Sequence, residues 1–600
     1  SLLGGVLAWI AAPELFRFSE AVWWAFLRLT DPGYLGDDQG ALLRALSTVL
    51  TVLGYVLFLG ALVAIMTQWL HRVMRGLELG LTDFAARDHI VILGWTERTP
   101  VIVHQLLLAR SKVRRFLRRH GVLWLRIVVL AEEAGPDLVK ELRERVGKLW
   151  RPSKVVIRTG SALRVEHLVR VSAHRAAAVV LPAAEYGVHP GLKDVSTVKT
   201  LLALAKRRGE SDDTAHFPVV VSEIADIRNL PVAQNAYPGP LELVPTERIV
   251  SRLLAQDLRH PGIADVYAQL LSYGSGSELY IRNADRFAGY TMEEVARYLP
   301  DALLLGYTRR EESDIRPYLN VASSSQLTEE DKLVVMAADY ELSDPTKRPE
   351  RPSVDRPAVP PMFAESHTGQ RILLLGWNSM APSLLSELGR YSRGAFRLVV
   401  ASSVSAEQRK SELEEHGTVS RKMRVEHIET DYTRADSLER IAPSDFDGIA
   451  VLASDWVHTA DEADARSITA ALLLQKLLDS SGPAAAGKPA PHVVLELIRP
   501  ENAALLSESR YDMFITSDLI SYVLTQVALR TEMNAVFEEL FTAGGPEIDL
   551  LEPRAYGLGA EPVSFGALEA RAASRGHTAL GWKTDSEGIV LNPPRERRIK

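Results

Sequence analysis

The chain has 600 residues, of which 46% are hydrophobic and 24% charged, and its formal net charge at pH 7 is −7. This composition excludes a wholly disordered chain and a nucleic-acid binder driven by overall charge, so no nucleic-acid partner is expected. The absence of cysteine excludes a disulfide scaffold, a thiol nucleophile and a thiolate metal site.

The N-terminal region predicts a membrane-spanning helix. From Ala45 to Leu70 no side chain is charged, and a helix of that length, about 39 Å, can cross a hydrocarbon core of about 30 Å. Basic residues follow at once in the stretch 71–75, whereas the stretch 30–40 holds three aspartates and no Lys or Arg. Positive-inside bias therefore places the residues after about 71 in the cytoplasm of a cell-membrane protein.

A short helix and a glycine-containing loop before that span predict a re-entrant pore segment. Phe18–Thr30 is too short to cross a bilayer, and it ends in a turn-rich acidic stretch. The negative C-terminal end of the short helix and the carboxylates after it would draw cations to the pathway. The predicted ion pathway consists of Thr30, Asp31, Pro32, Gly33, Tyr34, Leu35, Gly36, Asp37 and Asp38.

Other readings of the N-terminal region stay open. Phe18–Thr30 also fits an amphipathic helix that rests on the bilayer, followed by an ordinary extracellular loop without conduction. Ser1–Ala12 is apolar but too short to span, and we interpret it as the tail of an earlier transmembrane helix in a multi-pass protein. Gly54 and Gly60 are candidate gating hinges or, equally, close helix-packing sites. The filter motif TVGYG is absent, so these residues do not predict potassium selectivity.

The rest of the chain contains two copies of one module. DHIVILGW at 88–95 matches QRILLLGW at 370–377, and TERIVSRLLAQ at 246–256 matches TSDLISYVLTQ at 516–526. In each copy short β-branched runs alternate with amphipathic stretches, which predicts a parallel, Rossmann-like α/β sheet covered on both faces. Strands are expected in the first copy at Ile90–Leu93, Ile127–Leu130, Val155–Ile157, Ala178–Leu181 and Val219–Val221.

A smaller α+β subdomain completes each module. In the first copy a long helix is expected from about Glu247 to Leu271, and then strands near Glu278–Ile281, Ala302–Tyr307 and Lys332–Met336. The last of these strands has no counterpart in the second copy, so we expect a chain cut from a longer protein. The expected domains are 1–80 (transmembrane pore region), 81–272 (first Rossmann-like module with linker helix), 273–343 (its subdomain), 344–368 (Pro-rich linker), 369–543 (second module with linker helix) and 544–600 (its incomplete subdomain).

A pore-like hairpin before two such modules resembles the CASTOR/POLLUX-type ion channels. The segments that carry the likeness are HIVILGW at 89–95, GSELYI at 276–281 and the stretch 510–548. The resemblance implies tandem RCK (TrkA-N-like) domains, which regulate conductance, in a homotetramer with a cytoplasmic gating ring. The expected function is therefore that of a subunit of a ligand-gated cation channel in the lipid bilayer. The expected permeant cation is potassium or calcium. The alternative is a membrane-anchored, nucleotide-sensing regulator of a cation transporter that conducts nothing itself.

Ligands of parallel α/β sheets bind at the carboxyl ends of the strands. The candidates for a ligand cleft there are Gly94, Trp95, Glu132, Glu223, Gly376 and Trp377. Only the first glycine of the dinucleotide motif G-x-G-x-x-G survives in each copy, which disfavours NAD or another nucleotide. No nucleophile elbow, P-loop or HExxH motif is present, so we expect no enzyme and name no certain cofactor.

The second copy carries carboxylates at its predicted strand ends. They are Glu429, Asp431, Asp455 and Glu496. Converging carboxylates are typical of a calcium site, but they also occur on solvated rims and as helix caps. The basic run Arg110–His120 is a second ambiguous feature, either a solvated helix end or a contact with anionic lipid.

Overall fold

The computed structural model describes the chain in two compact units, Ser1–Thr82 and Asp83–Lys600. The described residues are all except 31–37, 39, 184–192, 207–216, 275, 313, 351–369, 392–395, 418–422, 481–489, 507–509, 542–544, 560, 585 and 600.

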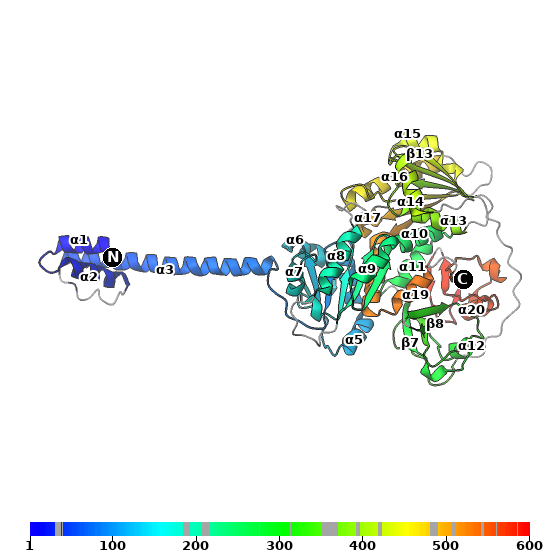
Figure 1. Ribbon diagram of the computed structural model, residues 1–600, viewed down its shortest axis with the longest axis horizontal. Coiled ribbons are helices and arrows are strands. Elements are labelled where there is room, and N and C mark those ends of the chain that lie inside the picture. Colours follow the sequence, from blue (N-terminus) through cyan, green and yellow to red (C-terminus); the bar gives the residue numbers. More distant parts are fainter. Residues whose placement is uncertain are drawn as a thin grey trace. The chain divides into compact units, whose positions relative to one another are not determined.

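The N-terminal unit consists of three packed helices, α1 (Leu2–Ala11), α2 (Phe18–Thr30) and α3 (Ala41–Glu78) (Figure 1). Helix α2 has the predicted bounds, and α3 extends the predicted span at both ends. The helices pack closely through small side chains such as Ala8, Ala21 and Ala25. Because these residues bring the backbones together, two short helices can lie against a long one.

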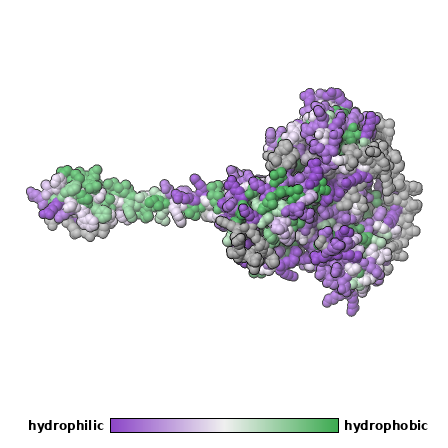
Figure 2. Space-filling view, viewed as in Figure 1, coloured by the Kyte–Doolittle hydropathy of each residue, from purple (hydrophilic) through white to green (hydrophobic). Residues whose placement is uncertain are grey.

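Helix α3 presents apolar side chains to its surroundings. An 18-residue window of its segment Ala41–Gly76 has a mean hydropathy of 2.5, and this segment is long enough to cross a bilayer, the one such helix among the described residues. Figure 2 shows hydrophobic side chains covering much of this unit's surface. Exposed apolar surface of this extent favours contact with lipid rather than water. The multi-pass topology stays a prediction.

The first module is a six-stranded parallel sheet with the strand order β3-β2-β1-β4-β5-β6. Its strands β1 and β4 have the predicted bounds, and they are buried because their IVIL and AVVL runs are covered by helices on both faces. The strands are β1 (Ile90–Leu93), β2 (Ile127–Ala131), β3 (Val155–Thr159), β4 (Ala178–Leu181), β5 (Val219–Ile224) and β6 (Leu241–Pro245). The helices are α4 (Thr99–Leu108), α5 (Arg110–Arg119), α6 (Pro136–Val146), α7 (Val165–Arg170), α8 (Lys193–Ala205) and α9 (Leu230–Ala236).

The second module repeats this topology, with the order β13-β12-β11-β14-β15-β16. Both orders are those of a doubly wound Rossmann-type sheet, which confirms the expected parallel α/β sheets. The strands are β11 (Arg371–Leu375), β12 (Phe396–Ser402), β13 (Met423–Glu429), β14 (Gly448–Val451), β15 (His492–Leu497) and β16 (Asp512–Ile515). The helices are α13 (Ala381–Tyr391), α14 (Ala406–His416), α15 (Ala435–Ile441), α16 (Ala460–Ser480) and α17 (Pro500–Ala503).

Smaller sheets follow each module. After the first, four antiparallel strands have the order β7-β10-β8-β9. Their bounds are β7 (Glu278–Asn283), β8 (Leu303–Glu311), β9 (Asp314–Leu319) and β10 (Lys332–Ala337), with α12 at Met292–Ala296. After the second, short strands pair as β17 (Val563–Ser564) with β20 (Arg598–Ile599) and β18 (Gly581–Thr584) with β19 (Gly588–Leu591), beside α20 (Phe565–Ala573).

The predicted helix from Glu247 to Leu271 is wrong as a single element. It is two helices, α10 (Thr246–Asp257) and α11 (Ile263–Leu271). The break contains Pro261, which lacks an amide hydrogen, and Gly262, whose φ of +89° belongs to the left-handed region. The second copy likewise has α18 (Thr516–Leu529) and α19 (Met533–Leu540).

These helices are exchanged between the modules. Helix α10 of the first copy packs against α13 of the second, and α18 of the second packs against α4 of the first. One hydrophobic core therefore runs through both modules, from Ile90 in the first sheet to Phe514 in the second.

Candidate functional site

A cleft of about 640 Å³ lies between the two modules. Its lining includes residues that end or follow parallel strands in both sheets: Ala183, Glu223, Trp377, Ala453 and Glu496. The carboxyl ends of the strands in the two copies thus contribute to one cavity, where a parallel α/β fold usually binds ligands.

Two buried glutamates hold the walls of this cleft in equivalent ways. In the first module, Glu223 accepts hydrogen bonds from the Ala183 amide at 2.9 Å and the Thr246 hydroxyl at 2.6 Å. In the second, Glu496 accepts from the Ala453 amide at 2.9 Å and the Thr516 hydroxyl at 2.9 Å. Each carboxylate ties three segments of its module together, so it has a structural task beside the cleft.

The two glutamates differ in their third partner. Arg98 forms an ion pair with Glu223, with 3.1 Å between guanidinium nitrogen and carboxylate oxygen. In the second module Asn378 donates to Glu496 at 3.2 Å. Because Arg98 carries a charge and Asn378 does not, the two halves of the cleft present different electrostatic environments to a ligand.

Two ion pairs link the modules, and the first of them lies in the wall of the cleft. His416 Nε2 of α14 lies 2.5 Å from Glu247 Oε1 of α10, and this hydrogen bond raises the pKa of His416 above its ordinary value. Buried Arg252 of α10 donates to Glu387 of α13, with 3.3 Å between the two atoms. The relative position of the modules is therefore coupled to charges next to the cleft.

The predicted ligand residues are only partly brought together. Glu223 and Trp377 line the cleft, and the Trp377 indole donates to Glu412 Oε2 at 2.5 Å. Among the described lining residues Gly94, Trp95, Glu132 and Gly376 do not appear. Gly376 shapes the turn instead, because its φ is +97° and an added Cβ would lie 2.7 Å from the Leu452 carbonyl oxygen.

The four predicted calcium ligands do not form a cluster in the described structure. Glu496 is engaged as above, and Asp455 accepts from the Ser379 amide at 2.8 Å. Asp431 pairs with Arg466 at 3.3 Å, and Glu429 accepts from the Ala406 amide at 3.2 Å. In the described structure these carboxylates accept hydrogen bonds at turns and helix starts or form an ion pair, and the calcium site stays a prediction.

The predicted ion pathway lies mostly outside the described residues, which exclude Asp31, Pro32, Gly33, Tyr34, Leu35, Gly36 and Asp37. The Thr30 hydroxyl donates to the Phe26 carbonyl at 2.9 Å at the end of α2. Asp38 is buried, where Arg28 contacts it at 2.7 Å and the Trp24 indole at 2.9 Å. The Arg28 charge compensates Asp38, and the role of Asp38 in the ion pathway stays a prediction.

The candidate hinges Gly54 and Gly60 have different surroundings. An added Cβ at Gly54 would lie 2.1 Å from the Leu29 carbonyl oxygen of α2, whereas at Gly60 it would meet nothing within 4 Å. The close approach of backbones at Gly54 is typical of a helix-packing glycine.

The basic run Arg110–His120 is exposed at its C-terminal end, from Arg118 to His120, as expected for a solvated helix end, and its preceding part packs against other segments of the chain. Contact with lipid stays a prediction. The run forms α5, in which Lys112 pairs with Glu278 at 3.2 Å and the Arg115 guanidinium lies 3.5 Å from the centre of the Tyr340 ring. Burial lowers the pKa of Lys112 to about 8. The segment is part of the contact between subdomains.

Comparison with known proteins bears on the function of this arrangement. Residues 247–353 match the family model described as "Castor and Pollux, part of voltage-gated ion channel". The chain is 24% identical to "Probable ion channel POLLUX" of Arabidopsis thaliana, over 97% of this chain and 71% of that protein. It is also 24% identical to "Ion channel CASTOR" of Lotus japonicus, over 99% of this chain and 70% of that protein. The chain resembles the CASTOR/POLLUX ion channels.

The predicted resemblance is thus confirmed, and the chain is a relative of ion channels rather than of enzymes. Among solved structures, the human SLO3 gating ring superimposes with a TM-score of 0.58 and 15% identity, over 86% of this chain and 97% of that chain. At that identity the likeness establishes the fold alone. The two modules therefore have an RCK-type gating-ring fold in an ion-channel relative associated with the membrane.

Proposed function

We propose that the chain is a subunit of a ligand-gated cation channel of the cell membrane. The N-terminal unit forms the pore, and the two RCK modules form part of a cytoplasmic gating ring in a homotetramer. The proposal is supported by relatives named as ion channels, the bilayer-length helix α3 and the gating-ring fold.

The observation that carries the proposal is the cleft shared by the two modules. A ligand changes a gate only if it binds one conformation better than the other. A ligand bound in this cleft contacts both modules, so its affinity depends on how they are placed. The ion pairs of Glu247 with His416 and of Arg252 with Glu387 hold that placement in the absence of ligand.

The lining of the cleft favours a cationic ligand. Carboxylates outnumber the Arg and Lys side chains among its lining residues, which include Glu247, Glu412, Glu415 and Asp455. A small cation, Ca²⁺ among others, would reduce the repulsion between these groups and draw the modules together.

The test is electrical recording from the full chain in planar bilayers. Reversal potentials in mixed K⁺, Na⁺ and Ca²⁺ measure selectivity, and Ca²⁺ or another cation is added on the side of the modules. We expect cation currents whose ligand dependence shifts to higher concentration in Glu415→Gln. Glu414→Gln, on the next residue but outside the described lining of the cleft, is the matched control.

Persistent silence of a correctly folded, reconstituted chain would contradict conduction and favour the non-conducting regulator. Equal ligand responses of Glu415→Gln, Glu414→Gln and the unmodified chain would contradict the cleft as the ligand site.

A further inference from the structure

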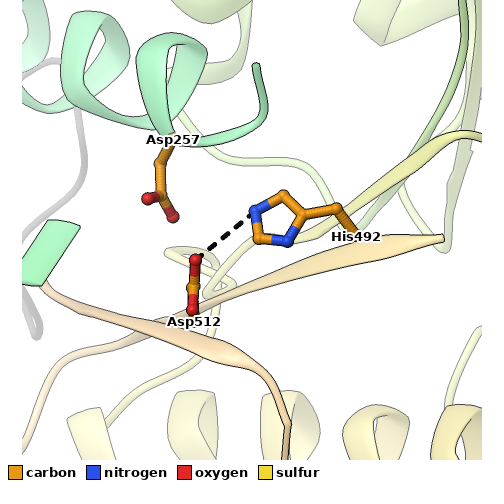
Figure 3. Close-up of side chains that lie close together, drawn as sticks. All are labelled: Asp257, His492 and Asp512. Carbon is orange, nitrogen blue, oxygen red and sulfur yellow. Dashed lines mark ion pairs between the residues drawn. The ribbon is translucent and has the colours of Figure 1, made fainter. Parts of the chain in front are cut away.

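Three titratable side chains that are distant in sequence meet at the opposite edge of the second sheet from the cleft. Asp257 is the last residue of α10, and His492 and Asp512 are the first residues of β15 and β16. One ligand atom from each lies within 4.8 Å of the others. Figure 3 shows the three side chains pointing toward one another, with the ion pair of 3.6 Å between His492 Nε2 and Asp512 Oδ2.

This cluster contains buried polar atoms that make no hydrogen bond among the described residues. Asp257 is fully buried, and its Oδ1 accepts from the Ala264 amide at 2.9 Å. Its Oδ2 and the Nε2 of His492 have no hydrogen-bond partner among the described residues. An unpaired buried carboxylate oxygen is costly, and burial together with Asp512 raises the pKa of Asp257 to about 7. A cation bound beside Asp257 would therefore offset the desolvation penalty of its buried carboxylate.

Two further charged groups face the cluster. Asp265 of α11 is close enough to Asp512 for repulsion to raise the pKa of Asp265, after burial as the larger cause. Lys583 of β18 is the nearby positive charge, and it lowers the pKa of Asp257. The Lys583 ammonium lies beside Gly262, where an added Cβ would come within 2.0 Å of it, and the Gly262 amide donates to Asp512. The Lys583 ammonium is thus a positively charged group at the edge of the cluster.

We propose that Asp257, His492 and Asp512 form a binding site for a divalent transition-metal ion of the Zn²⁺ type, with water completing the coordination. Carboxylate oxygen and imidazole nitrogen bind Zn²⁺ at roughly 2.0–2.2 Å, which places ligand atoms about 3.4 Å apart around the ion. The separations seen here are at most 4.8 Å, and that between His492 Nε2 and Asp512 Oδ2 is 3.6 Å. Binding therefore requires an approach of at most about 1.4 Å.

The ligand set distinguishes this ion from calcium. Ca²⁺ takes six to eight oxygen ligands, whereas an imidazole nitrogen with two carboxylates suits Zn²⁺, Fe²⁺ or Mn²⁺. Burial also lowers the pKa of His492, which favours the neutral imidazole that binds metal.

The internal repeat supplies a comparison within the chain. Aligning Thr246 with Thr516 places Val527 opposite Asp257 and Glu242 opposite Asp512, and the PVVV and PHVV strands place Val219 opposite His492. The equivalent position in the other copy therefore lacks two of the three ligands. The cluster is a feature of one module contact, with one site per chain.

A bound ion would link helix α10 of the first copy to the sheet of the second copy. Asp257 belongs to the first copy and the other two ligands to the second, so the metal bridges them at the edge away from the cleft. The ion would stabilise one relative placement of the modules, because only that placement brings the three ligands together.

Direct metal binding to the full chain in detergent tests the site, and it does not depend on whether the chain conducts. After equilibrium dialysis against Zn²⁺, bound metal is measured by mass spectrometry. We expect one Zn²⁺ per chain, an affinity reduced about tenfold or more in His492→Gln and Asp257→Asn, and tighter binding in Lys583→Met. Co²⁺ in place of Zn²⁺ should give visible absorption bands that His492→Gln abolishes.

His260→Gln is the matched control. It removes another histidine that pairs with a carboxylate, Asp549, at 3.2 Å, and it should leave Zn²⁺ binding unchanged. Zn²⁺ should raise the melting temperature of the unmodified chain but not that of His492→Gln, which reports on binding in a folded variant. The proposal is overturned if the unmodified chain binds no Zn²⁺, if both ligand variants bind it equally well, or if His260→Gln loses as much affinity.

Discussion

Arg28 and Asp38 form a charge pair inside the N-terminal unit. Two bonds at 2.7 and 3.2 Å join the guanidinium to the carboxylate. Asp38→Asn leaves the Arg28 charge uncompensated, so we expect a loss of about 3–5 kcal/mol in unfolding free energy. The double variant Arg28→Gln with Asp38→Asn should be less destabilised than Asp38→Asn alone, as measured by denaturation of the reconstituted chain. Additive losses in the double variant would contradict this pairing.

The pair of His416 and Glu247 makes the contact between the modules sensitive to pH. Because the hydrogen bond to Glu247 raises the pKa of His416 above 6.5, its stabilising effect is complete below pH 6.5 and is lost as pH rises through the raised pKa. We expect the melting temperature of the full chain to fall over this range. In His416→Gln this pH-dependent fall in melting temperature should be absent. An identical pH profile of the melting temperature in the variant would show that His416 is not its cause.

At the scale of single residues, sequence reasoning found positions but not partners. It selected Glu223 and Glu496 correctly as strand-end residues, yet their amide and hydroxyl partners come from loops and helices far along the chain. It missed Asp257, His492 and Asp512 because 235 residues separate the first two. Only the exchanged packing of α10 brings them together, and the histidine at the start of the apolar strand β15 was the one available signal.

At the scale of elements, the crossing of α2 and α3 depends on Gly54. A methyl group there would lie 2.1 Å from the Leu29 carbonyl oxygen, a backbone atom that cannot rotate away. Gly54→Ala should therefore lower stability by about 1–3 kcal/mol, whereas Gly60→Ala has free space and should be neutral or slightly stabilising. Thermal unfolding of both variants in the same detergent measures the difference. An altered gating curve in Gly54→Ala without a loss of stability would instead favour a hinge.

Elements with a strong pattern were predictable, and elements that depend on tertiary contacts were not. The strands β1 and β4 have the predicted bounds because uninterrupted β-branched runs need burial on both faces. The break after Asp257 was missed, although Pro261 and Gly262 are breakers, because apolar residues continue on both sides. Strand β6 was missed because LELVP alternates polar and apolar residues and pairs at the edge of the sheet.

At the scale of the whole molecule, the common core predicts joint unfolding of the two modules. The core includes Ile90 and Ile372 from the two central strands and residues of α10 and α18. Neither module can lose its packing without exposing the other, so calorimetry of the full chain should show one transition for both. The calorimetric and van't Hoff enthalpies of that transition should agree. Two resolved transitions, each assigned to one module, would show that the modules unfold independently and that the common core does not couple them.

The exchange of α10 and α18 also affects how the modules respond to dilution. Two identical single-module chains that swapped such helices would separate at low concentration. Here both partners belong to one polypeptide, so the local concentration of each for the other is set by the length of the chain between them. The stoichiometry of the pair is then always one to one, whatever the abundance of the protein in the cell.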